Sequence, residues 1–251
     1  MRLCVFAQCY NELSKGNLLR WLSHVRQYAD WVVVYDDGST DGSADLLKRE
    51  VDIFIDGRVN DFREEIAHKQ ALMDQCLKAE PPIDWFLWLD IDEVLDRIGT
   101  GSLREFCERA GLQAYYFPEI TLWRSGCWMR RDYLGQGTFL RLWRNDGKMR
   151  FPECHRLHGQ QYPQGLVAQG DAFFSVIHYG YASTDQILSR WFTRNRLGVP
   201  VAGREPCLDE SRMLLEHVPH DAFPLGCEPV HSGPPAPDGF MARTLRRGLL
   251  G

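Results

Sequence analysis

Acidic side chains follow two hydrophobic runs of the chain, and their types and spacing suit the binding of a cation. Asp36 and Asp37 follow the run WVVVY, and Asp90, Asp92 and Glu93 follow the run WFLWL. Carboxylates at the end of a buried strand are costly unless their charges are matched. A hard divalent cation that also chelates a substrate diphosphate would match them. The alternative is that Asp90 caps the next helix and that Asp92 and Glu93 are solvated.

Alternating strands and helices must position these clusters. Short apolar runs predict strands, and helical spacing and turn signals predict helices between them. The strands are expected at 2–7, 31–35, 51–55 and 85–89, and the helices at 18–27, 44–50 and 61–79. This alternation favours an α/β fold with a doubly wound, mostly parallel sheet that is covered on both faces. In such sheets ligands bind at the carboxyl ends of the strands, where the acidic clusters lie.

The pattern changes after residue 96. A helix is expected at 102–110 and another at 184–196, with strands at 114–117, 138–143 and 173–177, which predicts an antiparallel extension of the same sheet. Eight of the 13 prolines lie between 200 and 237, and none of the 8 tryptophans does. We therefore expect one domain at 1–198, with halves 1–96 and 97–198, and an irregular, proline-rich extension at 199–251.

The segments YNELSKGNLLRWLSHV, WVVVYDDGSTDGS and WFLWLDIDEVL, in this order, resemble the inverting nucleotide-sugar glycosyltransferases of family 2. The resemblance covers residues 2–96 and continues more loosely to about 196. It implies a glycosyltransferase A fold, which is Rossmann-like. It also implies transfer of a sugar from a nucleotide-diphosphate donor, with UDP favoured, to an acceptor hydroxyl.

The resemblance also assigns donor-binding residues. Gln8 and Tyr10 match positions that flank the nucleotide base, Asp36 matches the carboxylate that contacts the base, and Asp37 matches its neighbour in the ribose and base pocket. Lys69 lies near a pair that faces the donor in the family. These residues would form the nucleotide pocket.

A second set of residues would hold Mn²⁺ or Mg²⁺ on the donor diphosphate. Asp90 and Asp92 match the family's DxD motif, and Asp90 would also contact the donor. His178 follows a hydrophobic run, and a late histidine in this fold often completes the coordination of the metal. The alternative for His178 is a satisfied core residue.

An inverting transfer also needs a base that removes the acceptor proton. The segment GKMRFPECHRLHG offers Glu153 first, and His155 and His158 as further candidates. Similar family members carry an acid at the position of Gly159, so this base has to come from elsewhere. Glu153 could instead be an exposed acid paired with Arg150 or Arg156, and Asp132 is a more distant candidate for the base.

The composition limits the partners. The formal charge of −5 and the pI of about 5.9 give no overall basic field for nucleic acid. The segment 119–158 contains eight basic residues and four acidic ones. The basic residues could bind an anionic acceptor or form a solvated face: Arg124, Arg130, Arg131, Arg141, Arg144, Lys148, Arg150 and Arg156. The 8 cysteines show no metal spacing, and neither a signal peptide nor a membrane span is visible. We therefore expect a cytoplasmic protein.

Three other functions compete with the glycosyltransferase. A nucleotidyltransferase of related fold usually has a glycine-rich, basic loop after its first strand, whereas this chain has AQCYNELSKGN. A non-catalytic homologue that only binds nucleotide-sugar would fit Gly159. A metal hydrolase built on His155 and His158 is the weakest alternative, because no patterned carboxylate ligand lies nearby.

Overall fold

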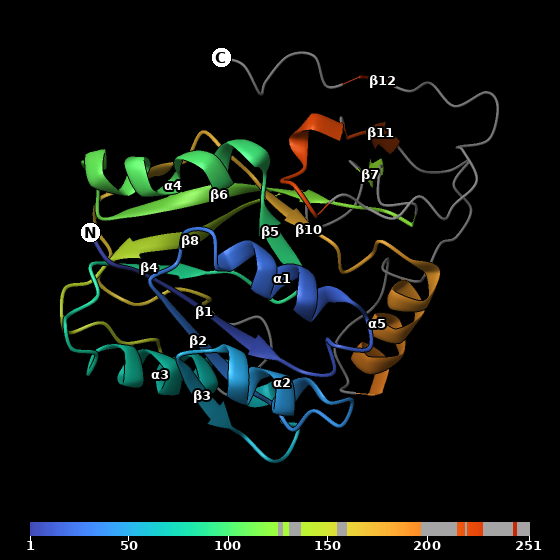
Figure 1. The fold of residues 1–251 in the computed structure, drawn as a ribbon, viewed down its shortest axis with the longest axis horizontal. Coiled ribbons are helices and arrows are strands. Elements are labelled where there is room, and N and C mark those ends of the chain that lie inside the picture. Colours follow the sequence, from blue (N-terminus) through green and yellow to red (C-terminus); the bar gives the residue numbers. More distant parts are fainter. Residues whose placement is uncertain are drawn as a thin grey trace.

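The computed structural model describes residues 1–124, 128–130, 137–154, 160–196, 215–218, 220–227 and 243–244. Within these residues, nine strands form one sheet in which β9 pairs with β6 beside the main path β3-β2-β1-β4-β8-β6-β10-β5. A smaller sheet has the order β12-β11-β7. Figure 1 shows the large sheet crossing the molecule with helices packed against it.

The first half of the chain builds the parallel part of the sheet. Its elements follow the expected alternation: β1 (Leu3–Cys9), α1 (Asn17–Val25), β2 (Trp31–Asp36), α2 (Ser43–Glu50), β3 (Ile53–Asp56), the 3-10 turn η1 (Phe62–Glu64), α3 (Glu65–Cys76) and β4 (Trp85–Trp88). Strand β1 pairs in parallel with β2 and with β4, and β2 pairs in parallel with β3. The expected helix at 61–79 is thus a 3-10 turn followed by a shorter α-helix.

The second half adds the antiparallel extension that the sequence predicts. It consists of β5 (Glu93–Leu95), α4 (Arg97–Arg109), β6 (Ala114–Thr121), β7 (Trp128–Arg130), β8 (Thr138–Arg144), β9 (Gln169–Asp171), β10 (Val176–His178), α5 (Thr184–Arg196), β11 (Leu215–His217), the 3-10 turn η3 (His220–Ala222) and β12 (Arg243–Thr244). Strand β8 runs antiparallel to both β4 and β6, whereas β10 is parallel to β6 and antiparallel to β5.

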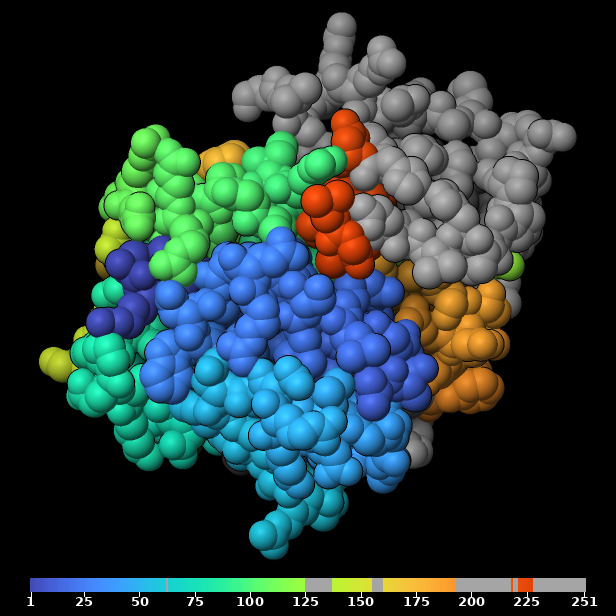
Figure 2. Space-filling view, in the orientation of Figure 1, coloured from blue at the N-terminus to red at the C-terminus, as the bar shows by residue number. Residues whose placement is uncertain are grey.

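Alternating side chains of the parallel strands build two apolar layers. Val32 and Val34 of β2 join a cluster with Trp21 of α1 and Leu103 of α4, whereas Val33 faces the opposite cluster, which contains residues of α3. Leu47 of α2 belongs to the first cluster. Helices α1, α2 and α4 therefore cover one face and α3 covers the other. Figure 2 shows α1 and α2 across the centre of this first face.

Three expectations from the sequence need correction. The strand expected at 173–177 is β10 at Val176–His178, because its ladder runs only over the residues that pair with β5 and β6. The helix expected at 102–110 begins at Arg97, where Asp96 Oδ1 accepts a hydrogen bond from the backbone N of Gly99 at 2.7 Å. Strand β5 directly follows the DxD motif and was not expected. Most of the extension 199–251 lies outside the described residues.

Candidate functional site

The order of the strands places a crevice at the carboxyl ends of β1, β2 and β4. The chain moves from β1 to β2 and β3 on one side, and β4 lies on the other side of β1, so the switch point lies between β1 and β4. Cys9 at the end of β1 pairs with Asp36 at the end of β2. Asp90 lies two residues beyond β4. Figure 1 shows α5 on the side of the sheet toward which β1 runs.

Asp36 has one carboxylate oxygen in use and one without a partner. Its Oδ1 accepts a hydrogen bond from the backbone N of Ser39 at 2.8 Å. Its Oδ2 is buried and has no hydrogen-bond partner among the residues that the structure describes. A buried acceptor without a partner is unfavourable and suits a donor group on a ligand. Contact of Asp36 with the nucleotide base, the role that the family resemblance implies, stays a prediction.

Asp37 holds the loop after β3 against the turn after β2. Its Oδ2 accepts from Asn60 Nδ2 at 2.7 Å, and its Oδ1 accepts from the backbone N of Asp61 at 2.9 Å. Burial raises the pKa of Asp37 to about 6. Gly38 has φ +75°, and a Cβ there would lie 2.9 Å from the backbone N of Asn60. Glycine is needed at this position because the two loops approach so closely.

Two of the remaining predicted donor residues are linked to α3, since Gln8 contacts its first residue and Lys69 is part of it. Gln8 Nε2 donates to the backbone O of Glu65 at 2.7 Å. Lys69 is 1% exposed, lies 3.4 Å from Glu65 Oε1, places its Nζ 3.8 Å from the centre of the Trp88 ring, and donates to Gln161. Burial lowers the pKa of Lys69. Gln8 therefore ties the start of α3 to the end of β1, and Lys69 packs from α3 against Trp88 of β4.

The sequence reasoning missed an aromatic pair beside Asp37. The rings of Tyr35 and His68 stack with centroids 4.1 Å apart and an angle of 13° between their planes. His68 Nδ1 lies 4.0 Å from Asp37 Oδ1. Tyr10, the aromatic residue that the family resemblance places beside the nucleotide base, is partly buried. His68 is a buried residue of α3 and meets Tyr35 only in the folded chain, so the sequence gives no signal for such a stack.

Asp90 is held at the mouth of the crevice and does not cap the next helix. Its Oδ1 accepts from Trp88 Nε1 at 2.7 Å, and its Oδ2 lies 3.5 Å from Arg141 Nη1. Its side chain is 44% exposed. The helix cap is Asp96 instead. Asp90 therefore remains accessible to a ligand.

Asp92 is buried between a histidine and an arginine. His178 Nε2 lies 3.3 Å from Asp92 Oδ2, and Arg190 Nη2 of α5 donates to the same oxygen. Burial alone would raise the pKa of Asp92, but Arg190 and His178 hold this pKa well below its usual range. The side chain of Arg190 crosses Gly180, where a Cβ would collide with both Arg190 and His178. Asp92 is thus ionised and neutralised from within the chain.

A second set of charges lies beside Asp90, where the buried Arg141 contacts Asp90 and two glutamates. Arg141 Nη2 lies 2.5 Å from Glu93 Oε1 and 3.4 Å from Glu119 Oε2. Burial raises the pKa of Glu93 to about 8, although Arg141 opposes this rise. Glu93 Oε2 also accepts from the backbone N of Asp90 at 2.9 Å. The sequence offers one signal for Arg141, a charged residue between two leucines of a strand, since lone buried charges are rare.

Asp92 and His178 are spaced like two neighbouring ligands of a divalent cation. Asp92 Oδ2 and His178 Nε2 are 3.3 Å apart, close to the separation of about 3 Å expected for neighbouring ligands of an octahedral ion. No group of three or more histidine, cysteine or acidic side chains is spaced for a metal within the described part of the chain. The pair fits two positions on a cation, and Arg190 has to leave Asp92 before a cation can bind there.

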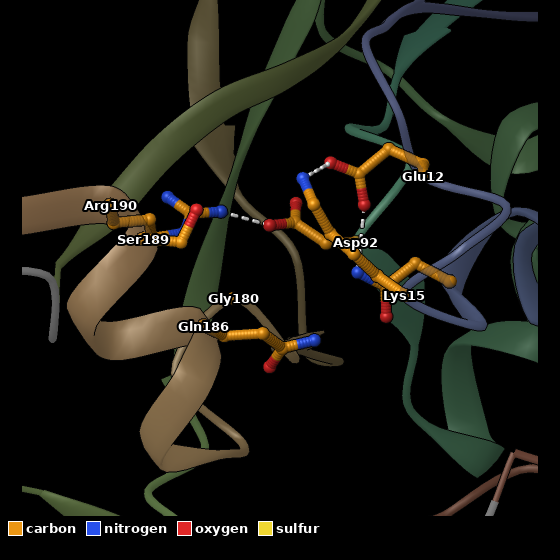
Figure 3. A pocket seen from close by; sticks show the side chains of 8 residues that line it. Glu12, Lys15, Asp92, Gly180, Gln186, Ser189 and Arg190 are labelled. Carbon is orange, nitrogen blue, oxygen red and sulfur yellow. Dashed lines mark hydrogen bonds and ion pairs between the residues drawn. The ribbon is translucent and has the colours of Figure 1, made fainter. Parts of the chain in front are cut away.

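A small pocket opens beside Asp92. Its lining comes from the loop before α1 and the first residue of α1, from Gly180, and from α5. The residues are Glu12, Lys15, Asn17, Asp92, Gly180, Gln186, Ser189 and Arg190. Figure 3 shows Arg190 reaching Asp92 across this pocket and Lys15 bonded to Glu12. Asn17 Nδ2 also donates to Glu12 Oε2 at 2.8 Å. Burial, and secondly the charge of Asp92, raise the pKa of Glu12. Glu12 was not among the expected site residues.

The candidates for the base are only partly described. Glu153 is exposed. His155, His158, Gly159 and Asp132 lie outside the described residues. Of the two arginines considered as partners of Glu153, Arg150 places Nη1 2.9 Å from Asp74 Oδ1, and Arg156 lies outside the described residues.

Arg141 and Arg144, two further basic residues of the segment 119–158, also contact other side chains of the chain. Arg141 serves the buried charges, and Arg144 lies 4.5 Å from the centre of the Trp85 ring. An anionic acceptor therefore stays a prediction.

The comparison with protein families decides the relationship. The model of the family described as "Glycosyl transferase family 2" matches residues 4–134, more than half of the chain. The chain belongs to glycosyl transferase family 2. This result confirms the predicted family, and the order of the strands confirms the predicted doubly wound fold of the glycosyltransferase A type with its antiparallel extension.

Solved structures similar to this family 2 chain include TarS 1-349 of S. aureus. That structure shows 16% identity and a TM-score of 0.36, over 49% of this chain and 36% of the other. The same TarS fragment in complex with UDP-GlcNAc shows 17% identity and a TM-score of 0.36, over 49% and 34% of the two chains. A glycosyltransferase involved in the glycosylation of the major capsid of PBCV-1 shows 10% identity and a TM-score of 0.34, over 58% and 61%. The chain thus spans about a third of the TarS fragment.

The search of curated proteins gives no match. In the described part of the chain, no helix has both the length and the apolar character needed to cross a membrane.

Proposed function

We propose that this chain transfers a sugar from a nucleotide-diphosphate donor to an acceptor hydroxyl with inversion at the anomeric carbon. Uridine is the base that the family resemblance favours. Asp90, Asp92 and His178 would hold Mn²⁺ or Mg²⁺. One observation carries the proposal: a chain of family 2 brings the acidic turn after β2 and the Asp92–His178 pair to the same edge of its sheet.

The donor would bind along the carboxyl ends of β1, β2 and β4. The free Oδ2 of Asp36 would accept a hydrogen bond from the base, and Asp37 keeps the loop at 57–61 closed over this part of the pocket. Gln8 would fix the start of α3 beside the donor, and Lys69 packs from α3 against Trp88 of β4. A divalent cation bound at Asp92 would neutralise the charge of the departing diphosphate.

The transfer is a single in-line displacement. The acceptor oxygen forms a bond to the anomeric carbon while the bond from that carbon to the diphosphate oxygen breaks. The acceptor proton would pass to Glu153, whose exposed carboxylate is the first candidate base. His158 is the second candidate.

A panel of nucleotide-sugars with Mn²⁺ tests the proposal, because slow hydrolysis of the donor needs no acceptor. We expect one donor class to release nucleoside diphosphate in a Mn²⁺-dependent manner, and we expect Asp92→Asn to lose this release. Asp45→Asn, an exposed acid on α2, is the control and should retain it.

Other results would redirect the assignment. Donor binding without release, also in the presence of simple sugars as acceptors, would indicate a non-catalytic homologue. Release of pyrophosphate from a nucleoside triphosphate and a sugar phosphate would indicate a nucleotidyltransferase.

A further inference from the structure

A buried indole holds one oxygen of the Asp90 carboxylate. Trp88 Nε1 donates to Asp90 Oδ1 at 2.7 Å, whereas Asp90 Oδ2 has only Arg141 Nη1 at 3.5 Å as a partner within the described part of the chain. Trp88 is 1% exposed, but the Asp90 side chain is 44% exposed. Residues two apart in an extended chain point to the same side, so the indole can reach forward to the carboxylate. The contact therefore joins the core to an acid that is open to a ligand.

The ring of Trp88 is itself fixed from two sides. Phe6 of β1 meets it edge to face, with ring centroids 4.9 Å apart and an angle of 81° between the planes. Lys69 of α3, which is also buried, places its Nζ 3.8 Å from the ring centre. A side chain in such close packing keeps one rotamer. The indole N–H thus has a constant position and direction, which β1 and α3 determine.

A fixed donor of this kind orders a carboxylate before any ligand arrives. An indole N–H can only donate, so its one hydrogen bond goes to Asp90. An exposed aspartate without such a partner rotates freely, and a ligand that binds it has to pay for the loss of that freedom in affinity. The hydrogen bond from Trp88 removes most of this loss.

We propose that Trp88 is a positioning residue of the donor site, whose indole N–H orients the Asp90 carboxylate before the nucleotide-sugar binds. The inference rests on the proposed function, because it requires Asp90 to contact the donor. It extends that function by a residue of the core that acts only through Asp90.

A double-mutant cycle measured by calorimetry with UDP in a buffer containing Mg²⁺ tests this role. Trp88→Phe keeps an aromatic ring and removes the N–H, and we expect UDP affinity to fall roughly 3–10-fold. In an Asp90→Ala background the same substitution should cause no further loss, because the carboxylate that it acts on is absent. Thermal unfolding checks that each variant folds.

Trp143 of β8 provides a matched control. It is fully buried, it also meets Phe6 edge to face, with centroids 5.6 Å apart, and it belongs to the same apolar cluster as Trp88. Its Nε1 has no hydrogen-bond partner among the residues that the structure describes. Trp143→Phe therefore makes the same change in the core without breaking such a bond, and it should bind UDP like the wild type.

The indole resonances in an NMR spectrum give a second readout that needs no tryptophan variant. Asp90→Ala should shift one indole N–H resonance, because Trp88 loses its acceptor. The same resonance should shift when the wild type is saturated with UDP and Mg²⁺. This measurement decides the question if Trp88→Phe does not fold or if Asp90→Ala binds UDP too weakly for the cycle.

The outcomes separate the two proposals. If the wild type binds none of UDP, GDP and ADP, the proposed donor site fails and this inference fails with it. If the wild type binds and Trp88→Phe binds equally well, or loses no more than Trp143→Phe, or loses the same factor in the Asp90→Ala background, only the positioning role is overturned. Indole resonances that ignore Asp90→Ala, or that ignore bound UDP, would overturn it as well.

Discussion

Replacement of Arg190 by glutamine should increase the affinity of the free protein for Mn²⁺. In the structure the guanidinium occupies Asp92 Oδ2, so a cation must displace it. A hydrogen bond to a charged group contributes about 1.5–3 kcal/mol. We take the lower part of this range, about 1.5–2 kcal/mol, because the Arg190 side chain is 35% exposed. Since 1.4 kcal/mol corresponds to a factor of ten, the expected gain in Mn²⁺ affinity is roughly 10–30-fold.

The same substitution should destabilise the metal-free protein. The Asp92 side chain is only 9% exposed, and it would retain His178 as its neighbour at 3.3 Å. We expect the free energy of unfolding to fall by about 1–3 kcal/mol without metal. Saturating Mn²⁺ should then raise the melting temperature of Arg190→Gln more than that of the wild type, because a cation that binds only the folded state stabilises it.

Calorimetry with Mn²⁺ and thermal unfolding with and without Mn²⁺ measure both effects. Arg104→Gln is the control, because the Arg104 side chain is about as exposed as that of Arg190 (41% against 35%) and forms an ion pair with Asp30 on another part of the molecule. Its Mn²⁺ affinity should equal that of the wild type. A folded Arg190→Gln variant with unchanged or weaker Mn²⁺ affinity would refute the competition between Arg190 and a cation.

Three further predictions concern the donor and the base. Asp92→Asn should abolish Mn²⁺-dependent binding of a nucleoside diphosphate in calorimetry while the protein stays folded, and unchanged affinity would contradict its role. Asp36→Ala should weaken nucleotide binding by about 1–3 kcal/mol with or without Mn²⁺; a loss confined to the Mn²⁺-dependent part would move Asp36 to the cation site. Glu153→Gln should keep donor and Mn²⁺ affinity while turnover falls roughly 10²–10⁴-fold, and His158→Ala should affect turnover much less. The reverse ranking would assign the base to imidazole, with a rate that falls as the pH drops through about 6.5, and full activity in both would direct attention to Asp132.

The parallel half of the fold was predictable because its signals are local. The runs around Val5, Val33 and Phe86 are apolar and short, and each is followed by residues that favour turns or helix caps. Strand β5 gave no such signal, because its three residues form a strand only through pairing with β10, far along the chain. Strand formation of this kind depends on partners more than on the residues themselves.

The site was predictable where it depends on strand ends. Asp36 and Asp92 lie where the sequence places them, because the carboxyl ends of parallel strands share one edge. Their roles stay predictions. Glu119 and Arg190 could not be found in this way, because which residue of β6 or α5 faces the acidic motif depends on strand register and helix packing.

The buried charges around the DxD motif set an order for folding during synthesis. Asp92 and Glu93 leave the ribosome long before Arg141, His178 and Arg190, which neutralise them in the finished structure. A carboxylate without its partner is strongly unfavourable in a protein interior, so this segment has to stay hydrated until those partners have been made. The nascent chain can therefore assemble β1, β2 and β3 early, but the charges at the edge that carries Asp92 are matched only after α5 has emerged. Chains that end before α5 would consequently expose an acidic, unpaired motif to the quality-control machinery of the cell.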